Sequence, residues 1–281
     1  MVEVTYDYTT FCEGKSACEV PLEVTKDMKG PVFVYYKLTN YYQNNRLYAK
    51  SFSTKQLKGE ALTVAELASS CDPLVGTDKP YYPCGLIANS YFSDMFTSLK
   101  LVDKDIPIGA QGITWPADVA AYGKSAYAAD DVLIPPSWSN FPDDLKKEFN
   151  IVGDKYVGSV PDLANNQRFI NWMKVAGFPA FRKLYGRIEQ SLDKGTYKMI
   201  INSNYDVQKF GGTKSVVLST TTWTGGQNSA LGWAFVAVGG VLLVLGLFFL
   251  GMFMMSPRKV GDVSYLSWYN ENLGDIVEEV Q

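Results

Sequence analysis

The chain has 281 residues, a net charge of −3 and no histidine. The small negative charge gives no electrostatic basis for nucleic-acid binding, which requires a clearly basic surface. The missing histidine excludes Ser-His-Asp and Cys-His nucleophile systems, HExxH zinc sites and haem held by a proximal histidine.

The first third of the chain contains one clear strand prediction. Gly30-Pro31 precedes residues 32–38, VFVYYKL, which are rich in the β-branched and aromatic side chains that favour a strand. Residues 40–50 are rich in tyrosine and asparagine, and they predict either a short helix or a turn-rich connection. Residues 60–69 predict a short helix, whereas the repeated glycine and proline of residues 103–142 predict irregular structure.

Two amphipathic helices are predicted between residues 163 and 188. Apolar residues recur at helical spacing over residues 163–177, and Pro179 restarts the pattern, which continues at intervals of three and four to Ile188. We expect this helix pair to cover a sheet. The basic residues of the second helix are then expected on a solvated face: Arg182, Lys183 and Arg187.

Two further strands are predicted near the end of this region. They comprise residues 198–202 and 215–219, with a turn at Gly211-Gly212 between them. Few other strong strand patterns are visible, so the sequence leaves the size of the sheet open.

Residues 231–255 form the longest apolar run, 25 residues without a charged side chain. As a helix with about 1.5 Å rise per residue the run would extend about 37 Å, enough to cross a hydrocarbon core of about 30 Å with some tilt. Trp223 and Trp233 near one end, and Tyr265 and Trp268 beyond the other, are typical of interfacial aromatic belts. We therefore expect a transmembrane helix rather than a buried core helix.

The charges beside this run predict its orientation. Arg258 and Lys259 follow the run closely, whereas residues 215–230 carry no charge. The positive-inside rule then places residues 256–281 in the cytosol and residues 1–230 on the exoplasmic side of the membrane. The expected exoplasmic domain is electroneutral, with 24 basic and 24 acidic residues.

The N-terminal sequence does not explain how such a domain crosses the membrane. The first residues, MVEVTYDYTTFCEG, have neither the basic segment nor the apolar segment of a signal peptide. We therefore expect that a signal or a first transmembrane helix is missing upstream of this chain.

The four cysteines, Cys12, Cys18, Cys71 and Cys84, all lie in the expected exoplasmic domain. An even number of cysteines in an oxidising compartment favours disulfides. Of the three possible pairings we favour the local one, Cys12 with Cys18 and Cys71 with Cys84. Zinc binding and free buried thiols are the alternatives, although the spacing does not match paired CxxC ligands. The chain has no Asn-x-Ser/Thr sequon, so N-glycosylation is not expected.

The sequence contains no recognisable active site. Neither GxxxxGK[ST] nor GxGxxG occurs, so no motif supports nucleotide binding. The adjacent acids Asp130-Asp131 and Asp143-Asp144 are more typical of turns than of an acid–base pair. We therefore expect no catalytic residues, no metal site and no cofactor.

The apolar run itself has a pattern that suggests a partner. Gly232, Gly239 and Gly246 recur every seven residues and therefore lie on nearly one stripe of a helix. Small residues on one face allow another helix to approach closely. The alternative is that these glycines have no special role, since glycine is common in transmembrane helices.

Six ordered sequence blocks resemble the cell division control protein 50 (LEM3-type) family. They cover much of residues 20–270 and read YYKLTNYYQNNRLY (35–48), PCGLIANS (83–90), FPAFRKLYGRI (178–188), FGGTK with LST (210–220), WTGGQN (223–228) and RKVGD with YLSW (258–268). Members of this family are accessory β-subunits of type IV P-type ATPases, the phospholipid flippases. The missing sequon departs from many members, which carry N-glycans.

The resemblance implies a mainly β, α+β exoplasmic domain. This domain would be an antiparallel β-sandwich with helical and irregular insertions, followed by a transmembrane helix that is the second of two. The expected domains are residues 1–230 (exoplasmic), 231–255 (transmembrane) and 256–281 (cytosolic tail). The family also has disulfides in this domain, which supports the local pairing.

The resemblance further implies a non-catalytic subunit. It would bind the catalytic α-subunit as a heterodimer among membrane lipids, help it leave the endoplasmic reticulum and stabilise states of its transport cycle. The complex would reside in the endoplasmic reticulum, Golgi, endosomal or plasma membrane. The alternative is an independent single-span receptor or adhesion protein with a disulfide-bonded ligand-binding domain.

Three groups of residues are expected to contact the partner. Within the membrane these are Gly232, Gly239 and Gly246. On the exoplasmic side, six residues of the family blocks are expected to contact the partner: Tyr41, Tyr42, Asn44, Arg46, Trp223 and Asn228. In the cytosolic tail they are Arg258, Tyr265 and Trp268, since this segment could lie along the inner membrane interface against partner helices.

Overall fold

The computed structural model describes residues 1–15, 17–101, 104–221, 229–257 and 261. The chain divides into two units, Met1–Gly226 and Gln227–Gln281. Strands and short helices make up the described part of the first unit. The second unit contains one long helix, α8 (Ser229–Met255).

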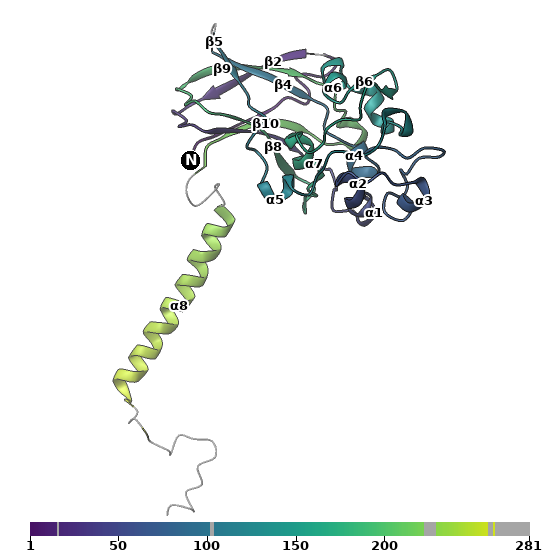
Figure 1. Ribbon diagram of the computed structural model, residues 1–281. Helices are drawn as coiled ribbons and strands as arrows, with labels where there is room; N and C mark the ends of the chain where they lie inside the picture. Colours follow the sequence, from purple (N-terminus) through teal and green to yellow (C-terminus); the bar gives the residue numbers. More distant parts are fainter. Residues whose placement is uncertain (16, 102–103, 222–228, 258–260, 262–281) are drawn as a thin grey trace, which may run out of the picture. The chain divides into compact units, whose positions relative to one another are not determined.

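Two four-stranded antiparallel sheets form the centre of the first unit, within the part of the chain that is described. The first sheet has the order β1 (Glu3–Asp7), β10 (Lys214–Ser219), β3 (Val32–Leu38), β8 (Phe181–Ile188). The second has the order β2 (Ala17–Val24), β9 (Gly195–Asn202), β4 (Met95–Leu101), β5 (Lys104–Pro107). Figure 1 shows the sheets as two layers. The antiparallel β-sandwich expected from the sequence is therefore confirmed.

Short helices fill the connections between the strands, and most of them gather at one end of the sheets (Figure 1). A small hairpin of β6 (Ile151–Val152) and β7 (Lys155–Tyr156) lies among them. The α-helices are α1 (Arg46–Lys50), α2 (Thr54–Leu57), α3 (Val64–Leu67), α4 (Leu86–Asn89), α5 (Pro116–Val119), α6 (Asp143–Glu148) and α7 (Gln167–Met173). The 3-10 helices are η1 (Ala129–Asp131), η2 (Pro136–Asn140) and η3 (Gln208–Phe210).

Strand β2 shows why several strands were not predicted. Its sequence ACEVPLEV alternates strictly between exposed and buried residues, as a strand with one face on the core requires. Pro21 and two glutamates have low strand propensity, so the composition of this segment does not predict a strand. Proline is tolerated here because β2 is an edge strand, where the missing N–H breaks no ladder.

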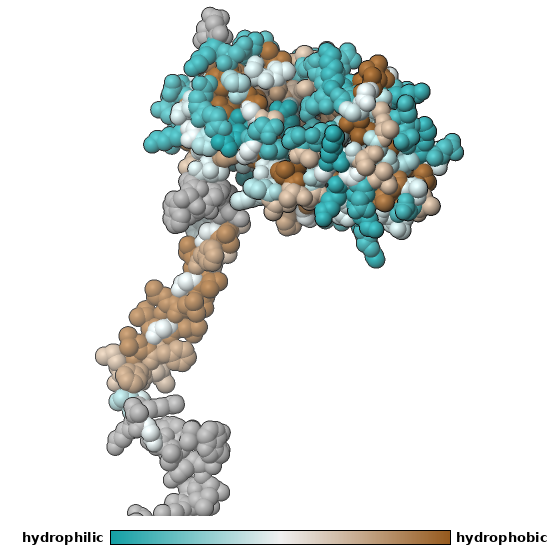
Figure 2. Space-filling model, viewed as in Figure 1, coloured by the Kyte–Doolittle hydropathy of each residue, from teal (hydrophilic) through white to brown (hydrophobic). Residues whose placement is uncertain are grey.

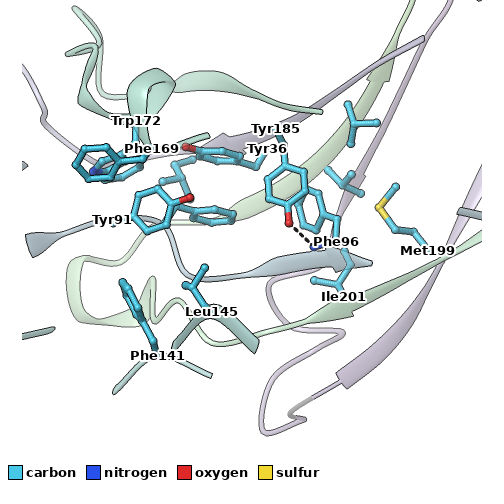
Figure 3. Packing of buried hydrophobic residues seen from close by; sticks show 14 of the residues in the cluster. Tyr36, Tyr91, Phe96, Phe141, Leu145, Phe169, Trp172, Tyr185, Met199 and Ile201 are labelled. Carbon is cyan, nitrogen blue, oxygen red and sulfur yellow. Dashed lines mark hydrogen bonds between the residues drawn. The ribbon is translucent and has the colours of Figure 1, made fainter. Parts of the chain in front are cut away.

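Side chains from both sheets and from the helices meet in one aromatic core. Figure 3 shows Tyr185 from the first sheet against Phe96 from the second, and Tyr36 from the first sheet on the side of Trp172 of α7. Two polar groups of this core form hydrogen bonds across it. The Phe96 N–H donates to the Tyr185 hydroxyl at 3.1 Å, and the Trp172 indole N–H donates to a carbonyl of α4 at 2.7 Å. The aromatic side chains therefore join the sheets to the helical insertions.

The second helix predicted between residues 163 and 188 is wrong, because Phe181–Ile188 is strand β8. It pairs with β3 in antiparallel register, and the register shifts between Val34 and Tyr35. At this irregularity two successive residues, Tyr185 and Gly186, are both buried, so the strict alternation of a strand is broken between Lys183 and Ile188. The mixed spacing resembles a helical pattern. The first predicted helix is present as α7.

The expectation of a solvated basic face on this segment is also wrong for Lys183. Arg182 is exposed, but Lys183 is buried. The reason is the two-residue period of a strand, which turns every second side chain toward the core.

The four cysteines form two disulfides, Cys12–Cys18 and Cys71–Cys84. This is the local pairing that the sequence favoured. The second disulfide lies in a small satellite core with Leu67 of α3, which contacts Leu62, Val75 and Tyr81. It therefore ties the segment after α3 to the segment that leads into α4.

Helix α8 is apolar on all sides. Residues Ala230–Met255 have a mean hydropathy of 2.6, and none of that window is buried in the structure. Figure 2 shows this helix as a continuous hydrophobic surface, in contrast to the mainly hydrophilic surface visible on the first unit. By length and composition, α8 is able to cross a membrane.

A buried ion pair joins four segments of the first unit. The Asp94 carboxylate, just before β4, lies 2.8 Å from the Lys214 ammonium at the start of β10, and both side chains are buried. The same carboxylate accepts hydrogen bonds from the Tyr8 hydroxyl at 2.8 Å and from the backbone N–H groups of Asn204 and Tyr205 at 2.6 Å. Every charge in this cluster is therefore compensated.

Replacing Asp94 with alanine should destabilise the protein by about 3–5 kcal/mol, because the Lys214 ammonium would stay buried without its countercharge. The double variant Asp94→Ala/Lys214→Met should lose clearly less, since the buried charge is removed as well. Thermal unfolding of the detergent-solubilised chain measures both. Equal losses in the single and double variants would contradict the role of the ion pair.

Candidate partner-binding sites

Tyr41, one of the expected contact residues, lies at the centre of an aromatic cluster. Its ring centroid is 5.1 Å from that of Phe210 and 6.0 Å from those of Tyr48 and Trp172. The Tyr41 N–H also donates to the Pro179 carbonyl at 3.0 Å. Intramolecular packing therefore occupies most of this ring, and Tyr41 anchors the loop that follows β3.

The next residues of this loop point to solvent. Tyr42 is 59% exposed and Leu47 is 70% exposed, and Asn44 and Arg46 are exposed as well. Asn45 caps the N-terminus of α1, because its side chain accepts hydrogen bonds from the N–H groups of the first helical turn. The helix thus turns Arg46 and Leu47 outward beside Tyr42.

A second loop, residues 174–179 between α7 and β8, lies against the first. The buried Gln43 side chain accepts a hydrogen bond from the Ala176 N–H at 2.9 Å, and the Asn44 side chain donates to the Gly177 carbonyl at 3.1 Å. At the tip of this second loop, Phe178 is 78% exposed. Two loops that are more than 130 residues apart in sequence thus form one surface.

A third segment, at the start of α5, completes this surface. Trp115 is 75% exposed. Asp118 of α5 forms an ion pair with Lys174, the first residue of the second loop. The Thr114 hydroxyl donates a hydrogen bond to the side-chain amide oxygen of Asn171 at 3.1 Å. We call the resulting group of exposed side chains the apolar surface: Tyr42, Leu47, Trp115 and Phe178.

Sequence reasoning found part of this surface and missed the rest. Of its four residues only Tyr42 was expected at a contact site, whereas Leu47, Trp115 and Phe178 were not. Trp115 stands between Thr114 and Pro116 in a segment predicted to be irregular, where a large aromatic residue has no core-facing pattern to explain it. That mismatch is the signal that could have identified it. Phe178 belongs to a family block but was assigned no role.

The buried Lys183 side chain fixes the start of the second loop, residues 174–179. Its ammonium donates to the carbonyls of Asn171 at 3.2 Å and Trp172 at 3.3 Å, and also to the carbonyl of Lys174. These are the carbonyl groups at the C-terminus of α7, where a cation is favoured. Burial, and secondarily the nearby Lys174 ammonium, lowers the pKa of Lys183 to about 7.

The glycine stripe of α8 is open along its length. A Cβ added to Gly232, Gly239 or Gly246 would meet no atom within 4 Å. Among the described residues, the stripe therefore makes no contact that would explain the glycines. Gly240 and Gly251 are equally open, but they lie on a different side of the helix, about 100–120° away.

Five expected contact residues lie outside the described part of the chain. They are Trp223, Asn228, Arg258, Tyr265 and Trp268. Among the residues that the structure does describe, no group of three or more cysteine, aspartate or glutamate side chains is placed to hold a metal ion.

The comparisons with known proteins agree on one family. The profile of the LEM3 (ligand-effect modulator 3) family / CDC50 family matches residues 3–259. ALA-interacting subunit 3 of Arabidopsis thaliana is 40% identical over 265 residues, which cover 93% of this chain and 70% of the relative.

Two further relatives come from other kingdoms. The phospholipid-transporting ATPase accessory subunit CRF1 of Saccharomyces cerevisiae is 39% identical over 265 residues, which cover 92% of this chain and 65% of the relative. Cell cycle control protein 50B of Homo sapiens is 34% identical over 281 aligned positions, which cover 87% of this chain and 77% of the relative. The chain thus spans slightly less than two thirds of the yeast relative's length.

The lowered pKa of Lys183 predicts a pH dependence of stability. Its ordinary pKa of 10.5 applies in the unfolded chain, so between about pH 7 and 10.5 the unfolded state binds more protons than the folded state. The free energy of unfolding should therefore rise with pH in this window, by about 1.4 kcal/mol per pH unit from this group. Below about pH 7 both states bind the proton, so the contribution of Lys183 no longer changes with pH.

The measurement is the difference in unfolding free energy between the wild type and Lys183→Met at pH 7, 8 and 9. The variant cancels the contributions of all other titrating groups. The wild type should gain stability relative to the variant across this series. A difference that does not change with pH would contradict the lowered pKa.

Proposed function

The chain belongs to the LEM3/CDC50 family, and on this premise we propose that it is a non-catalytic accessory β-subunit of a type IV P-type, phospholipid-transporting ATPase. The observation that carries the proposal is the extent of the family match, which begins at β1 and ends beyond α8. The relatives in yeast and in Chaetomium thermophilum are named as accessory subunits of phospholipid-transporting ATPases. In this role the partner supplies ATP hydrolysis and the lipid path.

The arrangement in the membrane follows from α8 and the residues beside it. Residues 231–255 span the bilayer, residues 1–230 lie on the exoplasmic side, and residues 256–281 form a cytosolic tail. Support comes from the uninterrupted apolar surface of α8 and from Arg258 and Lys259 at its C-terminal end. Two disulfides in the first unit fit an oxidising exoplasmic compartment.

The described structure offers a subunit two separate kinds of contact. In the membrane, the open glycine stripe lets a partner helix approach α8 closely. Outside it, the loop of Tyr42, Asn44 and Arg46 presents exposed side chains on a rigid sandwich. Contacts that differ between the conformations of the ATPase shift their populations by the difference in free energy. The same contacts favour export of the assembled heterodimer from the endoplasmic reticulum.

The first experiment is gentle detergent purification of the tagged full-length protein from its own membranes, followed by mass spectrometry. We expect a large P-type ATPase in stoichiometric amount. A monomer, under detergent conditions that leave such complexes intact, would contradict the proposal and favour an independent receptor.

The glycine stripe predicts a specific loss of assembly. The double variant Gly239→Leu/Gly246→Leu should reduce co-purified ATPase several-fold, because two large side chains would separate the helices. The matched control is Gly240→Leu/Gly251→Leu, which adds the same side chains on another side of α8. Thermal unfolding should report an unchanged exoplasmic domain in both variants. Equal co-purification of the two double variants would rule out the stripe as a contact face.

A further inference from the structure

We propose that a groove on the first unit binds a neutral pyranose sugar. The groove lies where the loop after β3, the end of α4, η2 and the segment from β9 to η3 meet, and its volume is about 280 Å³. This inference goes beyond the proposed function, because sugar binding needs no contact with the ATPase.

The groove is lined by an unusual set of residue types. Its lining side chains are aromatic, amide, hydroxyl or charged, and among the described residues that line it none is aliphatic. Pockets for acyl chains and other apolar ligands are lined mainly by hydrophobic side chains. The lining therefore favours a compact ligand that carries many hydroxyl groups over a lipid tail.

The aromatic part of the groove consists of three half-buried rings, those of Tyr41, Tyr205 and Phe210. The ring centroids of Tyr41 and Phe210 are 5.1 Å apart, and that of Tyr205 is 6.5 Å from each of them. The rings thus pack edge to face against one another, and they do not surround a space as the cage for a quaternary ammonium group does. A pyranose has C–H groups on the faces of its ring, and these pack well on such an aromatic surface.

The polar part of the groove has open hydrogen-bonding groups. The Ser137 hydroxyl and the Asn140 side chain, both exposed on η2, form no hydrogen bond among the described residues. The Asn89 side-chain oxygen accepts the Ser137 N–H at 2.8 Å, so the N–H groups of the same amide stay available to a ligand. Each amide can donate and accept, which matches sugar hydroxyls because each of these also does both.

Buried contacts hold these groups in position. The Asp94 carboxylate accepts the backbone N–H groups of Asn204 and Tyr205 at 2.6 Å. The Asn204 side chain in turn donates to the Ser93 hydroxyl at 3.0 Å and to the Asn140 carbonyl at 3.1 Å. The Tyr205 ring and η2 are therefore fixed before a ligand arrives, which reduces the entropy lost on binding.

The charges of the groove point to a neutral ligand. Asp206 and Lys209 are the charged side chains of its described lining, and they lie 3.6 Å apart as an ion pair. Their charges cancel, so the groove offers no net charge to a phosphate group or to a sulfated sugar. A neutral sugar needs no such charge.

The origin of the sugar is restricted by the sequence. An N-glycan of residues 1–281 cannot be the occupant, because these residues contain no Asn-x-Ser/Thr sequon. Free sugars and the end rings of glycans on other molecules share the same chemistry. We therefore define the ligand by its ring, a neutral pyranose, rather than by the molecule that carries it.

The test measures sugar binding to the full-length chain in a detergent that has no sugar headgroup. The probes for saturation-transfer difference NMR are methyl α-D-mannopyranoside, methyl β-D-galactopyranoside and methyl N-acetyl-β-D-glucosaminide. At least one of them should bind with a dissociation constant on the order of 1 mM. Sorbitol has the hydroxyl groups without the ring, and it should bind at least about tenfold more weakly.

Variants locate the binding in the groove. Ser137→Ala/Asn140→Ala removes open polar groups and should weaken sugar binding at least about tenfold, the loss expected for two hydrogen bonds. Ser69→Ala/Asn165→Ala is the matched control, since both residues are exposed and neither lines the groove. Phe210→Leu should also weaken binding, whereas Phe210→Tyr keeps the ring and should largely retain it. Thermal unfolding should be unchanged in both double variants.

Several results would overturn the inference. These are binding of none of the probes at about 10 mM, sorbitol binding as tightly as the sugars, and equal binding by the two double variants. Because no step of this test involves the ATPase, each of these results leaves the proposed function untouched.

A glycan array with the same protein identifies the source of the sugar. Retention on neutral glycans supports a glycan ligand. Binding of a methyl glycoside without retention on the array supports a free sugar, and both results agree with the inference. Retention confined to sialylated or sulfated glycans contradicts it, because the ligand would then be recognised by its charge.

Discussion

The Asp94 carboxylate is the interaction on which the rest of the first unit depends. It pairs with the Lys214 ammonium and accepts hydrogen bonds from the Tyr8 hydroxyl and from two backbone N–H groups after β9. The carboxylate, which precedes β4, therefore connects the segment after β1, the segment after β9 and the start of β10. Two of these segments belong to one sheet of the sandwich and two to the other. An ion buried at this depth is tolerable only when all of its hydrogen-bonding capacity is used, so the arrangement specifies one register between the layers.

A rigid sandwich matters because the presented surface consists of loops. The apolar surface lies where β3 leaves the core, where β8 enters it and where α5 begins. Loops position side chains accurately only when the elements beside them are fixed. Here the fixing groups are themselves buried and polar: Gln43 between two loops, and Lys183 beneath the C-terminus of α7. Buried polar side chains thus support an exposed apolar surface, the reverse of the usual distribution.

The second unit differs from the first because its helix is apolar on all sides. Helix α8 has no amphipathic face, so no aqueous interface would orient it, and its apolar side chains distinguish one neighbour from another very little. Selectivity in such a helix has to come from shape, and Gly232, Gly239 and Gly246 leave one stripe of the helix without side chains. An accessory subunit that combines the two units would use close packing for contact in the membrane and fixed anchors for contact outside it. The two kinds of contact respond differently to mutation, because one depends on volume and the other on exposed side chains.

The sequence by itself determined those features that depend on near neighbours. The apolar run of α8, strands β3, β9 and β10, helix α7, the two short-range disulfides and the family blocks all follow from local composition or spacing. The tertiary structure decided everything that depends on distant partners. A register irregularity opposite Val34 and Tyr35 made β8 look helical, and the two-residue period of this strand turned Lys183 toward the core. Asp94 meets Tyr8 across 86 residues, and the Asn44–Gly177 and Asp118–Lys174 contacts join loops that lie far apart in the sequence. Periodicity reports which side of an element is buried, but not which other element covers it. Packing between residues far apart in the chain determines which element covers the buried side, and no local sequence pattern contains that information.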